Sequence, residues 1–264
     1  MIITSAQNPL IKATADLREA RARKKSGLML IDGVREINRA LKAGVNITQA
    51  FVCPKLFTNR GEAELLAQLT KLKIEIIEVN EAVFGKLGFG ERQEGLLTVA
   101  VIPKRMLNEL SLSKKPLVVI VEAVEKPGNL GAIMRTADAV GADALIVCDQ
   151  KTDIYNPNVI RASTGVVFNL PVVAASAQET LDFLRARKIK VCATLVEAKQ
   201  NYTQADLSGA VAIVLGTEDQ GLSDFWAKNA DIKVNIPMRG VADSLNVSTS
   251  AAIILYESLR QRQS

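Results

Sequence analysis

The stretch PLVVIVEAVEKPGNLGAIMRTADAVG, residues 116–141, contains one complete unit of the chain's architecture. Its first nine residues are nearly continuous in Val, Ile, Leu and Ala, which is typical of a strand covered on both faces. Pro127 and Gly128 then turn the chain, and a helical spacing of apolar residues follows, ending at Gly141. The apolar positions of this helix are Leu130, Ile133, Met134, Ala137 and Val140. The stretch therefore predicts a strand, a polar loop and a helix.

The same alternation continues toward the C-terminus. Helices are expected at about 178–187 and 246–261, between or after strand-like runs. Those runs are ALIVCD (144–149), VVFNLPVVAA (166–175), KIKVCATLV (188–196), VAIVLGTE (211–218) and IKVNIPM (232–238). This pattern predicts an α/β domain over residues 116–264.

Residues 1–102 show a second, smaller alternation, which predicts an α/β sandwich. The segment at about 102–116 has two prolines and no sustained strand pattern, so residues 103–115 are expected to be a linker with one helical turn. Strands are expected in LMLID (28–32), at about 49–53, in IEIIEV (74–79) and in GLLTVAVI (95–102), with helices at about 9–25, 33–43, 61–71 and 80–86.

Composition excludes several chemistries. The 264 residues include no histidine, so a Ser-His-Asp triad, a Cys-His pair and a His-ligated metal site are impossible. Cys53, Cys148 and Cys192 form no CxxC pair and are expected to be buried thiols rather than metal ligands. No apolar run approaches the roughly 18–20 residues of a membrane span, and the N-terminus lacks the apolar core of a secretory signal. A cytoplasmic protein with no metal and no membrane anchor is expected.

Charge is unevenly distributed along the chain. Residues 1–107 carry a net charge of +6, whereas residues 108–264 carry −1. A run of basic residues is more often a solvated helix face than a binding surface. Concentration of the excess on one domain favours a surface for nucleic acid. The excess is densest in Lys12, Arg18, Arg21, Arg23, Lys24 and Lys25.

Three junctions after predicted strands are unusually polar and rich in glycine, at residues 122–136, 215–222 and 236–248. Ligands of open α/β sheets bind beyond the carboxyl ends of the strands, so these junctions predict a site. Asn129 is expected to be a helix N-cap, and Ser244 or Asn246 is expected to cap the last helix. Gly216 is expected to let a ligand approach the backbone. The chain has no phosphate-binding P-loop, and GFGERQEG (88–95) fails the spacing of a dinucleotide fingerprint.

In this order, the junctions resemble the three motifs of the SpoU family of ribose 2′-O-methyltransferases, in the SPOUT superfamily. The matching text is EKPGNLGAIMRTADAVGAD (125–143), IVLGTEDQGLS (213–223) and VNIPMRGVADSLNVSTSAAIILYE (234–257), together with NPNVIRASTGVVFNLPV (156–172). Residues 5–41 resemble, more generically, the family's N-terminal substrate-binding domain, although Asp32 stands where Glu is more usual.

The resemblance implies a C-terminal α/β domain with a deep trefoil knot and a homodimer whose active sites are completed by both subunits. It also implies S-adenosylmethionine as methyl donor and structured RNA as substrate. The implied catalytic residues are Asn129, Arg135, Glu218, Ser244 and Asn246. The implied cofactor contacts are Thr194, Leu195, Val196, Gly216, Ile236, Met238, Leu245 and Val247. RNA contacts are expected at Arg21, Arg23, Lys24, Lys25, Arg35 and Arg161.

The role of Arg135 has two interpretations. The family's proposed general base is the arginine that matches Arg135, but guanidinium stays protonated in proteins. A clamp on the target phosphate that also stabilises the developing alkoxide is the preferred interpretation. Ribosomal RNA is favoured over transfer RNA because of the extra N-terminal domain. The alternatives are a transfer RNA enzyme, an enzyme that methylates a base, and a non-catalytic RNA-binding protein with a vestigial methyltransferase domain.

Overall fold

The computed structural model describes residues 2–58, 61–88, 94–217 and 221–263. The chain forms two compact units. The N-terminal unit comprises Met1–Lys104 and Asp153–Asn169, and the C-terminal unit comprises Arg105–Thr152 and Leu170–Ser264. A segment from the second half of the sequence is therefore part of the N-terminal unit.

A four-stranded sheet forms the centre of the N-terminal unit, in the order β1-β4-β2-β3. Strand β4 runs antiparallel to β1 and β2, while β2 and β3 are parallel. The strands are β1 (Leu28–Asp32), β2 (Ile47–Val52), β3 (Glu75–Glu78) and β4 (Leu96–Val101). The helices are α1 (Pro9–Asp16), α2 (Ala20–Ser26), α3 (Val34–Lys42), α4 (Glu62–Lys71) and α5 (Glu81–Leu87), with a 3-10 turn at Pro54–Leu56.

The helix expected at about 9–25 is two helices, because the chain turns between α1 and α2. Arg23 on α2 is 1% exposed, and its guanidinium donates hydrogen bonds to the carbonyl oxygens of Leu17 and Arg18 at 2.8 and 2.6 Å. It also forms an ion pair with Asp153 at 2.6 Å. The expectation that Arg23 contacts RNA is therefore wrong, since its charge is buried and paired inside the protein.

The segment 153–169 packs against β1 and α3 within the N-terminal unit. It forms α7 (Pro157–Ala162) and a 3-10 turn at Val166–Phe168. Arg39 donates to both the carbonyl and the hydroxyl oxygen of Thr164 at 2.6 Å. A long strand over 166–175 was expected from the apolar run, but only β7 (Val172–Ala174) forms. The apolar side chains before it are buried in the turn instead.

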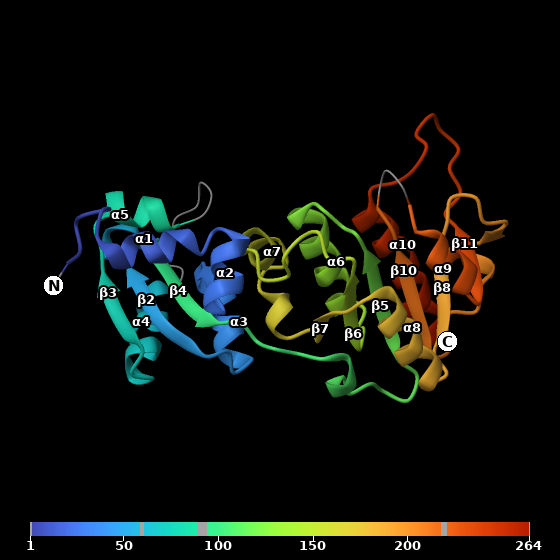
Figure 1. Ribbon diagram of the computed structural model, residues 1–264, viewed down its shortest axis with the longest axis horizontal. Coiled ribbons are helices and arrows are strands. Elements are labelled where there is room, and N and C mark those ends of the chain that lie inside the picture. Colours follow the sequence, from blue (N-terminus) through green and yellow to red (C-terminus); the bar gives the residue numbers. More distant parts are fainter. Residues whose placement is uncertain (1, 59–60, 89–93, 218–220, 264) are drawn as a thin grey trace. The chain divides into compact units, whose positions relative to one another are not determined.

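A parallel sheet of seven strands forms the centre of the C-terminal unit as far as the structure describes it, in the order β7-β6-β5-β10-β8-β11-β9. Figure 1 labels all of these strands except β9. The chain places β10 between β5 and β8, so strands that are distant in sequence lie side by side. The remaining strands are β5 (Leu117–Glu122), β6 (Ala144–Cys148), β8 (Lys190–Thr194), β9 (Gln200–Asn201), β10 (Val211–Leu215) and β11 (Ile232–Asn235). All residues of β5, β6 and β10 are buried, as expected for strands covered on both faces.

Helices cover both faces of this sheet. α6 (Pro127–Ala139) and α10 (Val247–Arg262) pack against each other, and α10 contacts β10. α8 (Ala177–Ala186) and α9 (Asp224–Asn229) pack on the face that buries Val118 and Ile120, where Trp226 is fully buried. The linker contains the expected single turn, at Leu107–Glu109, and a further 3-10 turn lies at Tyr202–Gln204. All three cysteines are buried. Within the described ranges, no helix has the length and apolarity needed to cross a membrane.

Candidate active site

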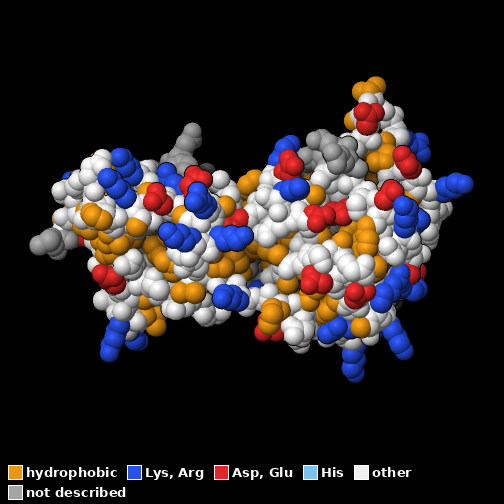
Figure 2. Space-filling view, viewed as in Figure 1, with side chains coloured by type: hydrophobic (Ala, Val, Ile, Leu, Met, Phe, Trp, Pro, Cys, Tyr) orange, Lys and Arg blue, Asp and Glu red, His pale blue; other side chains and the backbone are white. Residues whose placement is uncertain are grey.

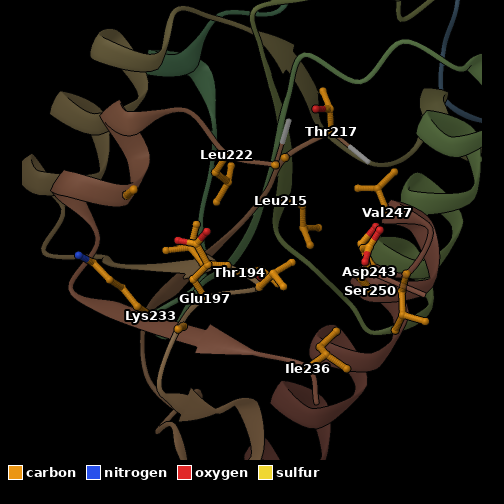
Figure 3. Close-up of a pocket in the computed structure, with 18 of the residues that line it drawn as sticks. Thr194, Glu197, Leu215, Thr217, Leu222, Lys233, Ile236, Asp243, Val247 and Ser250 are labelled. Atoms are coloured by element: carbon orange, nitrogen blue, oxygen red, sulfur yellow. The ribbon is translucent and has the colours of Figure 1, made fainter. Parts of the chain in front are cut away.

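A pocket of about 590 Å³ opens at the carboxyl ends of β8, β10 and β11 (Figure 3). Its walls come from the segment after β8, from the two ends of the β10–α9 loop, and from the loop between β11 and α10. All eight residues that were expected to contact the cofactor line it: Thr194, Leu195, Val196, Gly216, Ile236, Met238, Leu245 and Val247. The structure thus brings together residues that lie up to 53 positions apart in the chain.

The pocket combines apolar walls with an excess of negative charge. Glu197, Asp224 and Asp243 line it, whereas Lys233 is its one basic residue among the described residues. Apolar walls suit a flat ring system, and the carboxylates favour a positively charged ligand. The sequence reasoning did not select these charged residues, nor Leu215, Leu222 and Ser250, which also line the pocket. Asp243 and Leu222 lie inside the motifs. Asp224 and Lys233 lie just outside them, and nothing in the sequence indicates that they line a pocket.

Thr194 provides a direct sign that a ligand belongs in this pocket. Its hydroxyl oxygen is buried and finds no hydrogen-bond partner within the described part of the chain. Leaving a buried polar group without a partner costs about 1–3 kcal/mol. The hydroxyl lies at the end of β8, at the wall of the pocket. A bound ligand with a polar atom at this wall would satisfy it.

Gly216 lines the pocket, and the fold of the neighbouring turn also requires glycine at this position. A Cβ atom at this position would collide with the backbone of Gly221 and Leu222. The missing side chain therefore makes room for the chain's own turn, in which Thr217 and Gly221 exchange backbone hydrogen bonds of 3.0 and 3.1 Å. The glycine shapes the pocket wall by allowing this close turn.

Asn129 and Asn246 lie in contact. The side-chain nitrogen of Asn246 donates to the side-chain oxygen of Asn129 at 3.2 Å. Asn246 is also the N-cap of α10, as expected, because its side-chain oxygen accepts from the backbone nitrogen and the hydroxyl of Ser248. Asn129 is not an N-cap: α6 begins at Pro127, so Asn129 is its third residue and its side chain is available for the contact with Asn246.

The other catalytic candidates are Arg135, Ser244 and Glu218. Arg135 is exposed on α6, and no carboxylate pairs with it within the described ranges. Ser244 is exposed and lines the pocket, in the loop that stands out from the sheet between β11 and α10 (Figure 1). Glu218 lies outside the described residues.

The candidate RNA contacts lie in the N-terminal unit, where Figure 2 shows several Lys and Arg side chains gathered at the surface. Arg21, Lys24 and Lys25 are exposed on α2. Arg35 is also exposed and forms an ion pair with buried Glu36 at 2.9 Å. Arg161 is partly buried and lies 3.7 Å from the carboxylate of Asp32. Three of the six expected contacts are therefore exposed cations outside any ion pair between described residues.

Comparison with known proteins matches both parts of the chain. The SpoU rRNA Methylase family matches residues 116–256, and the MRM3-like substrate binding domain matches residues 8–98. A 23S rRNA (uridine(2479)-2′-O)-methyltransferase of Streptomyces viridochromogenes is 32% identical, covering 98% of this chain and 92% of that protein.

Two solved structures share the fold over the whole chain. A crystal structure of an RNA 2′-O ribose methyltransferase is 45% identical, covers 100% of both chains and has a TM-score of 0.89. The SpoU methyltransferase AviRb from Streptomyces viridochromogenes, crystallised with its cofactor AdoMet, is 30% identical, with a TM-score of 0.90 and coverage of 98% of this chain and 99% of that chain.

The parallel sheet, the pocket at its carboxyl edge and these likenesses define an S-adenosylmethionine-dependent RNA methyltransferase with the SPOUT α/β fold, of which the C-terminal trefoil knot is part. The chain belongs to the SpoU rRNA methylase family, which confirms the prediction from its motifs. The pocket fits S-adenosylmethionine: it offers apolar walls, an unsatisfied Thr194 hydroxyl, and carboxylates that complement the sulfonium and ammonium charges.

Proposed function

We propose that this chain transfers a methyl group from S-adenosylmethionine to a ribose 2′-hydroxyl of ribosomal RNA. The observation that carries the proposal is the contact of Asn129 with Asn246, because it joins the first and third motifs close to the cofactor pocket. Relatives that act on a 23S rRNA ribose support this substrate class, and such a substrate implies action in the cytoplasm. The individual roles below rest on the geometry of the site.

The cofactor-binding residues are those that line the pocket. The bound donor supplies an activated methyl group on a sulfonium, so the reaction needs no metal to activate it. The Thr194 hydroxyl would meet a polar atom of the cofactor, and Leu195, Ile236 and Leu245 would hold its apolar parts. Carboxylates in the pocket favour the cation over a neutral analogue.

The acceptor side of the site must orient a poor nucleophile. A ribose hydroxyl reacts only when aligned with the methyl carbon, so positioning contributes a large part of the rate. Asn129, Asn246 and Ser244 orient the ribose through hydrogen bonds. Arg135 holds the target phosphate and stabilises the developing alkoxide, since its guanidinium remains charged. The ribose oxygen bonds to the methyl carbon as that carbon leaves the sulfur, and the hydroxyl proton passes to solvent. Glu218 is proposed to orient the motif loops or Arg135.

Substrate RNA binds first through the N-terminal unit in this proposal. Arg21, Lys24 and Lys25 form an exposed basic face on α2, and Arg35 and Arg161 add further positive charge to the unit. Contacts of this kind bind phosphates without reading sequence. The nucleotide that is methylated is therefore selected by the fold of the RNA together with the shape of the site.

A homodimer is part of the proposal. α10 leaves Tyr256 52% exposed and Ile253 only partly buried, next to the α6 helix that carries Arg135. An apolar helix face beside a catalytic arginine supports an interface through which a second copy completes each site.

Mapping of 2′-O-methyl groups in RNA from cells with and without the gene tests the proposed function. We expect one ribose methylation in ribosomal RNA to disappear with the gene and to return on complementation. Loss of a transfer RNA or base methylation would replace the proposed substrate. An unchanged methylation map, with no binding of S-adenosylmethionine in calorimetry, would support a vestigial domain and contradict the proposal.

A further inference from the structure

We propose that Glu122 is a positioning residue that fixes the position of the β5–α6 loop relative to the end of the β10–α9 loop. It lies at the last position of β5 and is 4% exposed. The inference rests on the proposed function, because the loops that it joins are those of the proposed cofactor and substrate sites.

The carboxylate of Glu122 is bound at both oxygens by one residue. The backbone nitrogen of Ser223 donates to one oxygen at 2.7 Å, and the Ser223 hydroxyl donates to the other at 2.7 Å. These residues are separated by 101 positions, so the pair joins β5 to the segment after β10. Hydrogen bonds to a charged acceptor are stronger than neutral ones, and little solvent competes with them at this depth.

On the cofactor side, Ser223 fixes the wall of the pocket. It is the residue before α9, whose Asp224 and Ala227 line the pocket, and it directly follows Leu222, which also lines it. Gly221, one position earlier, is paired with Thr217 by two backbone hydrogen bonds. Fixing Ser223 therefore fixes both described ends of the β10–α9 loop.

On the substrate side, Glu122 is the point at which the chain leaves β5 for α6. The next residue, Ala123, has a φ of +55°, a strained conformation for a residue with a side chain, and its backbone nitrogen donates to the Cys148 carbonyl at 3.0 Å. From there the chain continues to Asn129 and Arg135. One buried carboxylate thus joins the start of the substrate-side loop to the end of the cofactor-side loop.

Isosteric substitutions test this role. Glu122→Gln keeps the shape but removes the charge. The amide oxygen can still accept from the Ser223 backbone nitrogen, while the amide nitrogen donates to the Ser223 hydroxyl, so two bonds to a charged acceptor become two neutral bonds. Ser223→Ala removes only the hydroxyl bond, and Ser223→Thr retains it. Glu125→Gln is the matched control, because the same substitution is made on an exposed side chain three residues away. For each variant, calorimetry measures the binding of S-adenosylmethionine, and a methyl-transfer assay gives KM and kcat. Thermal unfolding gives the melting temperature, and the fluorescence of Trp226, the only tryptophan, reports on the packing of α9.

We expect Glu122→Gln to raise the Kd and KM for S-adenosylmethionine about tenfold, the order of the difference between hydrogen bonds to a charged and to a neutral acceptor. Ser223→Ala should give a smaller rise, and Ser223→Thr and Glu125→Gln should stay within about twofold of wild type. Without cofactor, the emission of Trp226 in Glu122→Gln should differ from that of wild type. At saturating S-adenosylmethionine the emission should return toward the wild-type value, and kcat should lie within about threefold of wild type. A global structural role would not show this return.

Unchanged cofactor binding in both Glu122→Gln and Ser223→Ala would overturn the inference while leaving the proposed function intact. Where Glu122→Gln fails to fold, Ser223→Ala decides, since it removes one bond and leaves the carboxylate. A wild-type protein that does not bind S-adenosylmethionine would instead contradict the proposed function itself.

Discussion

The side-chain amide of Asn246 donates a 3.2 Å hydrogen bond to the side-chain oxygen of Asn129, across 117 positions of sequence. One side chain caps α10 and the other lies in the first turn of α6. Two motifs that are distant along the chain therefore meet at one pair of polar groups close to the cofactor pocket. This convergence allows the roles of the individual residues to be separated by substitution.

Asn246 caps α10, and we propose that it also orients the ribose; different substitutions distinguish these two roles. Serine is also a good N-cap, so Asn246→Ser should preserve the melting temperature but lose the reach to Asn129, and we expect kcat to fall at least about tenfold. Asn246→Ala should lose the same activity and in addition about 1 kcal/mol of stability. Turnover and thermal unfolding of both variants provide the measurement. A Ser variant with wild-type kcat would remove Asn246 from the catalytic site.

Arg135 is predicted to act on the substrate and not on the cofactor. Arg135→Ala should abolish methyl transfer, while the Kd for S-adenosylmethionine stays within about twofold of wild type. Arg135→Lys keeps a charge without the planar fork, so a small part of the activity should return. Calorimetry and a methyl-transfer assay on the same preparations test this. Clearly weakened donor binding would contradict the clamp.

The exposed basic face of α2 is predicted to bind RNA phosphates. Replacing Arg21, Lys24 and Lys25 together by alanine should reduce the slope of log K against log salt by about 2–3, the value for three phosphate contacts. The matched control replaces Arg187, Lys188 and Lys190, three exposed cations of the C-terminal unit. Binding titrations at several salt concentrations should leave that control near wild type. Equal salt dependence of RNA binding in wild type, the α2 variant and the control variant would show that Arg21, Lys24 and Lys25 do not contact RNA.

Arg23, although it lies in the same basic run, is predicted to stabilise the fold. Arg23→Met keeps much of the volume but leaves Asp153 and two carbonyl oxygens without their donor. Breaking a buried pair in this way costs about 3–5 kcal/mol. Urea unfolding should show that loss. A stable variant with weakened RNA binding would show instead that Arg23 reaches the substrate.

The cysteines are predicted to be unreactive in the folded protein. Burial raises the pKa of Cys192 to about 12 and that of Cys148 to about 11, and also raises the pKa of Cys53. A raised pKa favours the neutral thiol, and thiol reagents attack only the thiolate. At pH 8, titration with a disulfide reagent should modify all three thiols rapidly in urea and only slowly in the native protein. Rapid native reaction at Cys192 would show that β8 is accessible.

The sequence predicts the central elements of the fold closely, because their patterns are local. The strand LMLID coincides with β1, and the helix expected from 246 coincides with α10 within one residue at each end. The eight cofactor residues were predicted from the resemblance to the family, and the structure places them in one pocket.

The errors arise where distant contacts override the local pattern. Nothing near Arg23 in sequence indicates that Asp153, 130 positions away, will pair with it. The pair of Glu122 and Ser223 was also missed. Glu122 lies in the first polar junction and Ser223 in the second motif, and neither stretch of sequence indicates their contact.

The most direct test of the central claim is to incubate the purified protein with ribosomal RNA and S-adenosylmethionine that carries a deuterated methyl group. The RNA is then digested to nucleosides, which are analysed by mass spectrometry. We predict one labelled nucleoside whose added mass stays with the ribose when the glycosidic bond breaks, and no label with Arg135→Ala. A label that stays with the base, or no label with an RNA that the protein binds, would contradict the account.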